Sequence, residues 1–422
     1  MATERQIRAA VVDPGLLTLP WDRPLVDWPP DVLAALPRGI SRHEVRFVRT
    51  TTGLVAVKEI GDSVAHGEYD MLRTLARLGA PAVQPLAVVS GRVSPDGEQL
   101  SSALVTRHLA YSLPYRALFS QQMRPEILTR LIDALAVLLV RLHLLGFFWG
   151  DVSLSNTLFR RDAGAFTAYL VDAETGELHP PLSDHKRAYD LDLARTNIIG
   201  ELMDLQAGEI APAEVDTIEV GDQIVERYET LWAELTQRES FSADELWRVE
   251  DRMNRLNQLG FDVDEIDITT DISGTAVSIQ PKVVDAGHYN RQVMRLTGLD
   301  VQENQGRRML NDLEQYRMSR GLLGAEESMV AHEWLAEVFE PTVRAVPAEL
   351  RRKLEPAEIF HEVLEHRWYV SQEQQRDVPM AEAVASYVRE VLAHRRDEHR
   401  LLDADSPERE VPWSLPASAP YF

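Results

Sequence analysis

The N-terminal half of the chain alternates between strand-like and helical patterns of apolar residues. Apolar and polar residues alternate over 54–60, and a second strand-like segment covers 102–109. Over 66–75 the apolar positions recur at helical spacing. A longer helix is predicted over 125–147, because Pro125 stands at its start and leucines recur along one side. This mixture predicts an α+β domain.

The C-terminal half is predicted to be mostly helical, with one β interruption. Residues 264–269 and 275–280 alternate in polarity around Asp271-Ile272-Ser273-Gly274, which predicts a β-hairpin. Four prolines beyond residue 403, with few apolar neighbours, predict a flexible tail. Helical periodicity covers 223–235, 243–259, 288–296, 302–320, 329–346, 349–368 and 381–401.

These patterns divide the chain into four parts. We expect an N-terminal segment over 1–30 and an α+β domain over 31–240, since several helices must follow the last strand to complete its core. A mostly helical domain with the hairpin is expected over 241–402, followed by the tail over 403–422.

An acidic loop after the long predicted helix carries the most informative chemistry. Asp151 and Asn156 are five residues apart, and Asp172 follows an apolar strand-like segment. Phosphoryl transfer needs a carboxylate that orients the acceptor hydroxyl and oxygen ligands for the metal ions on the phosphates. An Asp and an Asn at this spacing also occur in loops closed by an Asx turn. The order of the elements favours the phosphotransferase interpretation.

Two upstream residues fit the same chemistry. Lys58 lies on the predicted strand 54–60 and is the only lysine before Lys186. Glu68 follows ten residues later on the predicted helix, where it is the candidate ion-pair partner of Lys58. We therefore expect Lys58 to contact phosphates and Glu68 to hold it in place.

Further nucleotide contacts are expected at two positions. Thr51, Thr52 and Gly53 form the turn before the predicted strand 54–60, and their hydroxyls and backbone amides are candidate phosphate contacts. Arg107, near the end of the strand-like segment 102–109, is the remaining candidate.

Residues 35–215 resemble the lipopolysaccharide kinase (Kdo/heptose kinase) branch of the protein-kinase-like superfamily, through the loop 146–159 and the segment 171–177. The whole chain resembles the bacterial DUF4032 family, in which such a region precedes a C-terminal domain of unknown function, and the segment 358–368 adds to this likeness. The resemblance implies a bilobal domain, with a small β-rich lobe and a helical large lobe, that uses ATP and Mg²⁺. It implies roles for five residues: Lys58 on the phosphates, Glu68 as its ion-pair partner, Asp151 as base, and Asn156 and Asp172 as metal ligands.

The sequence departs from a protein kinase at three places. It has no glycine-rich loop before Lys58. Trp149 replaces the His that stands two residues before the catalytic Asp, and Asp172 is followed by Ala and Glu instead of Phe and Gly. Small-molecule kinases of the superfamily tolerate all three changes. Glu174 is either an additional metal ligand or a solvated carboxylate.

Other polar groups leave alternatives open. Asp190 or Asp192 could brace the catalytic loop, or serve as an ordinary carboxylate near a helix start. The segment 361–366 lacks the spacing of a zinc-peptidase motif, so paired side chains on a helix are favoured over metal binding. The face formed by Asn304, Arg308 and Asn311 indicates a polar helix packed on the kinase-like domain, or a site for an anionic ligand.

Composition limits the kinds of molecule that the protein is expected to bind. The formal net charge of −23 disfavours nucleic acid and anionic lipid as partners. The chain has no cysteine, so a cytoplasmic location is expected. The most apolar run, 134–149, is too short to span a membrane and contains Arg141 and His143.

The sequence therefore predicts an ATP- and Mg²⁺-dependent phosphotransferase that acts on a hydroxyl of a sugar or small metabolite. The alternative is an ATP-binding pseudokinase whose C-terminal domain binds a partner protein. A helical structural protein with chance motifs would bind no nucleotide.

Overall fold

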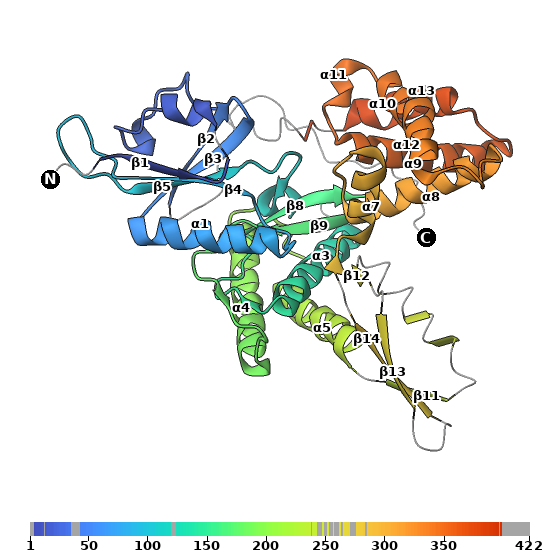
Figure 1. The fold of residues 1–422 in the computed structure, drawn as a ribbon, viewed down its shortest axis with the longest axis horizontal. Helices are drawn as coiled ribbons and strands as arrows, with labels where there is room; N and C mark the ends of the chain where they lie inside the picture. The colour runs from blue at the N-terminus through green and yellow to red at the C-terminus, as the bar shows by residue number, and fades with distance from the viewer. Residues whose placement is uncertain are drawn as a thin grey trace.

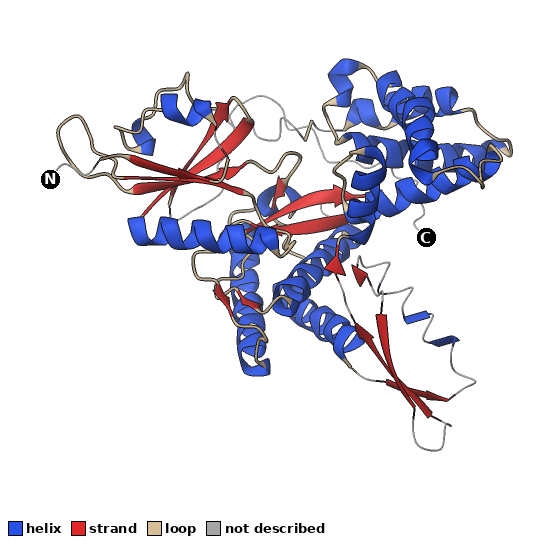
Figure 2. Cartoon of the chain, viewed as in Figure 1, coloured by secondary structure: helices blue, strands red, loops and turns tan. Residues whose placement is uncertain are grey.

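The computed structural model describes residues 4–11, 13–34, 43–119, 124–237, 239–242, 247–248, 251–252, 256, 261–262, 265–270, 276–282, 285–395 and 397–398. They form a sheet-based small lobe, a helical large lobe and a C-terminal helical bundle (Figure 1). Strands concentrate in the N-terminal half and helices at the C-terminal end (Figure 2). The structure is thus the α+β arrangement that the sequence predicts. Among the described helices, none has the length and apolar character needed to cross a membrane.

The small lobe is built on a five-stranded antiparallel sheet in the order β1-β4-β5-β3-β2. Val88 and Leu104 on one face pack with helix α1, whereas Val89 and Val105 on the other face pack with the N-terminal segment. That segment contributes buried Trp21 and two short 3₁₀ turns. The elements are β1 (Gln6–Ala9), η1 (Pro14–Thr18), η2 (Leu25–Asp27), β2 (Glu44–Thr50), β3 (Gly53–Ile60), α1 (Asp62–Arg77), β4 (Pro85–Ser90) and β5 (Ser102–Arg107).

The large lobe is organised around helix α3 (Pro125–Leu144), whose apolar residues pack with α5 and β9. The helix ends three residues before the predicted end at 147, because Gly146 adopts a φ of 79° that ends the helix. The remaining elements are β6 (Leu113–Pro114), α2 (Tyr115–Leu118), β7 (Phe147–Phe148), β8 (Thr157–Asp162), β9 (Ala165–Leu170), β10 (Glu177–Leu178), α4 (Asp184–Ala207) and α5 (Thr217–Thr236).

The C-terminal bundle has a core around Trp334, Phe339 and Phe360. Two predicted helices are interrupted by prolines. The helix over 329–346 contains a π-helical turn before Pro341, which has no N–H to donate, and the helix over 349–368 is broken before Pro356. The elements are α7 (His288–Thr297), α8 (Glu303–Ser319), α9 (Glu327–Trp334), η4 (Leu335–Phe339), α10 (Glu340–Ala345), α11 (Ala348–Arg351), α12 (Pro356–Gln374), α13 (Met380–Glu390) and η5 (Leu392–His394).

The predicted β-hairpin is present between the large lobe and the bundle. Strands β13 (Glu265–Thr270) and β14 (Ala276–Lys282) pair antiparallel, and β11 (Glu239–Ser242) adds a third strand. β12 (Phe261–Asp262) pairs with β15 (Asp285–Ala286). The predicted tail over 403–422 lies outside the described residues, as does most of the predicted helix over 243–259.

Candidate active site

Lys58 and Glu68 meet between the small-lobe sheet and helix α1. Strand β3 leads directly into α1 through Gly61, so residues ten apart face each other. Lys58 Nζ donates to Glu68 Oε2 at 3.1 Å, and the Glu68 carboxylate is almost fully buried. The structure thus brings together the two residues that the sequence pairs.

Asp172 joins this pair from the large lobe. It follows strand β9, and its Oδ2 accepts a hydrogen bond from Lys58 Nζ at 2.6 Å. Glu174 also approaches, with Oε2 3.5 Å from Lys58 Nζ and 3.1 Å from His43 Nε2. Strand β9 ends at Leu170, and Glu174 stands in a turn two residues after Asp172.

The carboxylates of Glu68, Asp172 and Glu174 have ligand atoms within 4.8 Å of one another. Among the described residues, this is the single group of three or more potential carboxylate, His or Cys ligands close enough to share a metal ion. Hard oxygen donors are the ligands that Mg²⁺ prefers. The residues therefore fit a divalent cation.

Burial and charge set the protonation of this cluster. Burial and the nearby Asp172 carboxylate raise the pKa of Glu68 to about 7. Burial opposes the charge of Lys58, but the attraction of Glu68 and Asp172 outweighs it and raises the pKa of Lys58. Burial also raises the pKa of Asp172, yet the charge and hydrogen bond of Lys58 lower it below its ordinary value. Lys58 and Asp172 are therefore both charged at neutral pH.

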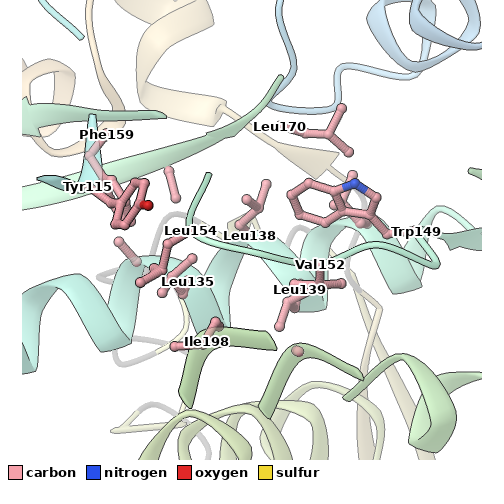
Figure 3. Close-up of a cluster of buried hydrophobic side chains, with 14 of the residues drawn as sticks. Tyr115, Leu135, Leu138, Leu139, Trp149, Val152, Leu154, Phe159, Leu170 and Ile198 are labelled. Carbon is pink, nitrogen blue, oxygen red and sulfur yellow. The ribbon is translucent and has the colours of Figure 1, made fainter. Parts of the chain in front are cut away.

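The loop that carries Asp151 is anchored by its own apolar residues. Trp149, Val152 and Leu154 are fully buried, and Figure 3 shows them with leucines of α3 in a cluster that also contains Ile198 of α4. Trp149 also donates from Nε1 to the backbone oxygen of Asp172 at 2.8 Å. The Trp that replaces a kinase His thus connects the loop directly to Asp172.

Asp190 braces this loop from helix α4. Its carboxylate is fully buried and accepts the backbone N–H groups of Trp149 and Gly150, each at 2.8 Å. Gly150 has a φ of 75°, which glycine adopts without steric cost. His143 Nε2 lies 3.1 Å from the same carboxylate. Of the two candidates, Asp190 is the brace, whereas Asp192 is exposed on the helix.

Two further residues of α4, neither of them predicted from the sequence, hold the loop. Glu201 accepts the backbone N–H of Leu154 at 2.6 Å and that of Ser155 at 3.0 Å. Asn197 Nδ2 donates to the backbone oxygen of Val152 at 3.0 Å. Their positions seven and eleven residues after Asp190 place all three polar side chains on one helix face, which is the signal that could have identified them.

Asn156 lies beside Asp151 at the end of the loop. Its Nδ2 donates to the backbone oxygen of Asp151 at 3.0 Å and to Oδ2 of the same residue at 3.2 Å. The amide nitrogen is thereby engaged, which leaves the amide oxygen as the atom suited to a metal ion.

The turn formed by Thr51, Thr52 and Gly53 lies apart from the carboxylate cluster. It is at the start of β3, five residues before Lys58, which places it roughly 16 Å away along the strand. The hydroxyls of Thr51 and Thr52 both donate to the carboxylate of Asp13, each at 2.5 Å. These hydrogen bonds keep the pKa of Asp13 low in spite of its burial. The turn is held by the N-terminal segment.

The opposite end of strand β2 lies nearer to the cluster. Glu44 is paired with Glu59, next to Lys58, and His43 reaches Glu174. Arg107 pairs with Val55 in the sheet and donates from Nε to Gln84 Oε1 at 2.8 Å. The structure therefore places Arg107 toward the connection between the lobes, with no described contact to the carboxylate cluster.

Several of the polar groups noted in the C-terminal half make packing contacts. Asn304 Nδ2 donates to Asp162 Oδ2 at 3.0 Å, so helix α8 packs on the kinase-like domain, as one of the two alternatives predicts. His361 Nε2 lies 3.9 Å from Glu365, and Glu362 accepts a hydrogen bond from the Tyr387 hydroxyl at 2.7 Å. Within the described part of the chain, these residues form no group that could hold a metal.

The sheet lobe with Lys58, the helical lobe with its acidic loop and Asp172 between them define a protein-kinase-like bilobal domain. Comparison with known families agrees with both predicted resemblances. Residues 49–206 match the lipopolysaccharide kinase (Kdo/WaaP) family. Residues 230–392 match a domain of unknown function, DUF4032. The first match supports a kinase-like phosphotransferase, a class that uses ATP and generally a divalent metal.

Comparison with solved structures gives 229 matching chains. One of them, described as WaaP in complex with acyl carrier protein, is 18% identical with a TM-score of 0.32. The alignment covers 53% of this chain and 90% of that one. No curated protein matches the chain.

Proposed function

We propose that the protein transfers the γ-phosphate of ATP to a hydroxyl group of a sugar or other small metabolite. The observation that carries this proposal is the meeting of Lys58, Glu68 and Asp172, which come from a strand, a helix and the end of a second sheet. An ammonium group held between two carboxylates is arranged to receive phosphate oxygens without further reorganisation.

Asp151 is the proposed base. The acceptor oxygen forms a bond to the γ-phosphorus as the bond between that phosphorus and the β–γ bridging oxygen breaks, and ADP leaves. Asp151 takes the hydroxyl proton. Asn156 orients the Asp151 carboxylate through its 3.2 Å hydrogen bond, and Asp190 and Glu201 hold the backbone on both sides.

Asp172 and Asn156 are the proposed Mg²⁺ ligands, and Glu174 is a third candidate because it belongs to the same carboxylate group. When bound, Mg²⁺ neutralises charge on the phosphates. Arg107, which lies toward the connection between the lobes, stays a candidate nucleotide contact. Thr51, Thr52 and Gly53 are not part of the proposed site. The first two donate their hydroxyls to Asp13, and the whole turn lies at the far end of β3.

The first test is thermal unfolding with ATP, in the presence and absence of Mg²⁺. Ligand at 100 times its Kd stabilises the folded state by about 2.7 kcal/mol. We expect a Mg²⁺-dependent shift in the wild type that Asp172→Asn loses. Glu177→Gln is the matched control, since Glu177 is an exposed carboxylate five residues on that pairs with Lys186. The absence of any shift in the wild type would refute the proposal.

The second test separates an enzyme from a pseudokinase. Phosphate transfer from ATP is measured over a panel of free sugars and polyols, together with ADP release in water. Asp151→Asn should keep the Mg²⁺-dependent thermal shift and lose turnover, because it removes the base and leaves the binding groups in place. Binding without turnover by the wild type throughout the panel would favour the pseudokinase alternative.

A further inference from the structure

The C-terminal bundle holds the tip of the β8–β9 hairpin, which extends from the large lobe toward helices α7 and α8 (Figure 1). Asp162, the last residue of β8, is fully buried. Its Oδ1 accepts the backbone N–H of Gln305 at 2.9 Å, and its Oδ2 accepts Asn304 Nδ2 at 3.0 Å. Thr167 across the hairpin donates to the same carboxylate at 2.9 Å. A carboxylate of the large lobe thus binds the first turn of a helix in the bundle.

The bundle also binds the backbone of the hairpin tip. Glu358, buried on α12, accepts the N–H of Ala163 through Oε2 at 2.9 Å. The same oxygen accepts Gln305 Nε2 at 2.9 Å, and that amide also donates to the backbone oxygen of Arg161 at 3.1 Å. The tip is therefore held through its side chains and through its main chain.

Two ion pairs flank these hydrogen bonds. Arg160 Nη2 lies 2.5 Å from Glu355 Oε1, and Arg161 Nε lies 2.5 Å from Glu398 Oε1. All four side chains are largely shielded from solvent. Separating the bundle from the hairpin would leave paired charges and hydrogen-bonded groups without their partners, so the hairpin has a strongly preferred position.

The other end of the same hairpin carries the proposed metal ligands. Asn156 immediately precedes β8, and Asp172 follows β9 by two residues. The strand pairing is continuous from Asp162 with Ala165 to Thr157 with Leu170, and Val171 N–H then donates to the Asn156 backbone oxygen at 3.0 Å. The six residues of β8 span roughly 20 Å.

We propose that the C-terminal bundle positions Asn156 and Asp172 by holding the tip of the β8–β9 hairpin, with Asp162 as the principal positioning residue. Because the two strands are hydrogen-bonded along their whole length, a fixed tip also fixes the base of the hairpin, where Asn156 and Asp172 are located. This inference rests on the proposed function for the roles of Asn156 and Asp172. It assigns a role in the kinase-like site to the part of the chain that matches a domain of unknown function.

The test uses the full chain and two isosteric variants, Asp162→Asn and Glu358→Gln, each of which weakens the hold on the tip from a different side. Asp312→Asn is the matched control. Asp312 lies about two turns beyond Asn304 and Gln305 on α8, where it accepts the indole N–H of Trp334 at 2.8 Å within the bundle. Hydrogen exchange is followed at the amides of 150–157 and 170–175, and MgATP binding is measured by titration.

We expect both hairpin variants to exchange roughly tenfold faster in these two segments and to bind MgATP more weakly. The control should lose thermal stability without either change. Unchanged exchange in both hairpin variants would overturn the inference, even where MgATP binding upholds the proposed function. Faster exchange in a protein whose wild type binds no MgATP would support the positioning role and reject the proposed function. If one variant does not fold, the other still decides between these outcomes.

Discussion

Replacing Asp190 with asparagine should destabilise the protein far more than the size of the change suggests. The carboxylate is fully buried and uses Oδ1 for the N–H of Gly150, and Oδ2 for the N–H of Trp149 and for His143. Asparagine keeps the shape of the side chain but offers one acceptor oxygen in place of two. Whichever way the amide turns, its NH₂ group faces a backbone N–H donor.

The expected magnitude follows from these contacts. A buried donor left without a partner costs about 1–3 kcal/mol, and a hydrogen bond to a charged group contributes about 1.5–3 kcal/mol. One lost bond to a carboxylate, together with the opposed donor groups, predicts that Asp190→Asn lowers the free energy of unfolding by about 2–4 kcal/mol. The loop before Asp151 would also lose its brace, so MgATP binding should weaken.

The assay is urea unfolding followed by tryptophan fluorescence, with Asp192→Asn as the control. Asp192 is exposed two residues further along the same helix, and surface substitutions of this kind usually change stability by less than about 0.5 kcal/mol. If the two variants differ by less than about 1 kcal/mol, the buried hydrogen bonds of Asp190 do not stabilise the loop as argued.

Two further predictions concern carboxylates that are partly or fully buried. Glu201→Gln should lower the free energy of unfolding by about 1–2 kcal/mol, because it loses one of two hydrogen bonds from backbone N–H groups. The control Asp204→Asn, on the exposed side of α4, should leave the free energy of unfolding unchanged. Equal urea midpoints for the two variants would contradict this prediction. Burial raises the pKa of Glu68 to about 7 and that of Asp162 to about 6, above the values of about 4 expected in the unfolded chain. Their contribution to stability is full below about pH 4 and is lost as the pH rises to about 7. The free energy of unfolding, measured with urea, should therefore fall between about pH 5 and about pH 8, and Glu68→Gln should make this fall smaller. If the variant shows the same dependence of stability on pH as the wild type, Glu68 is not the source of the fall.

Much of the kinase-like domain could be predicted because its chemistry follows the order of its elements. Lys58 and Glu68 are ten residues apart across one strand-to-helix connection, and a polar residue on each is constrained to face the other. Asp151 and Asn156 share one short loop. The order of the elements assigned Lys58 and Asp172 to one site, but the hydrogen bond between these two residues, which are distant in sequence, was not predicted.

The contacts of the threonine turn could not be predicted from the sequence. Thr51 and Thr52 stand at a turn before Lys58, and nothing in the local pattern indicates that Asp13 occupies their hydroxyls. Which end of a strand faces a site depends on the neighbouring strands. The register that places Arg107 opposite Val55 became known only from the folded sheet.

Periodicity and motif order were sufficient for the fold class, most of the described helices, the hairpin strands and the acidic residues of the candidate site, because these depend on neighbours within a few turns of chain. The brace by Asp190 and Glu201 and the hold of the C-terminal bundle on Asp162 could be decided only by the folded molecule. Each joins groups about 40 to 140 residues apart, and partners so distant leave no periodic trace in either segment. The packing of the folded chain decides which of these groups meet, because a polar group that is removed from water must be hydrogen-bonded by a partner that lies next to it.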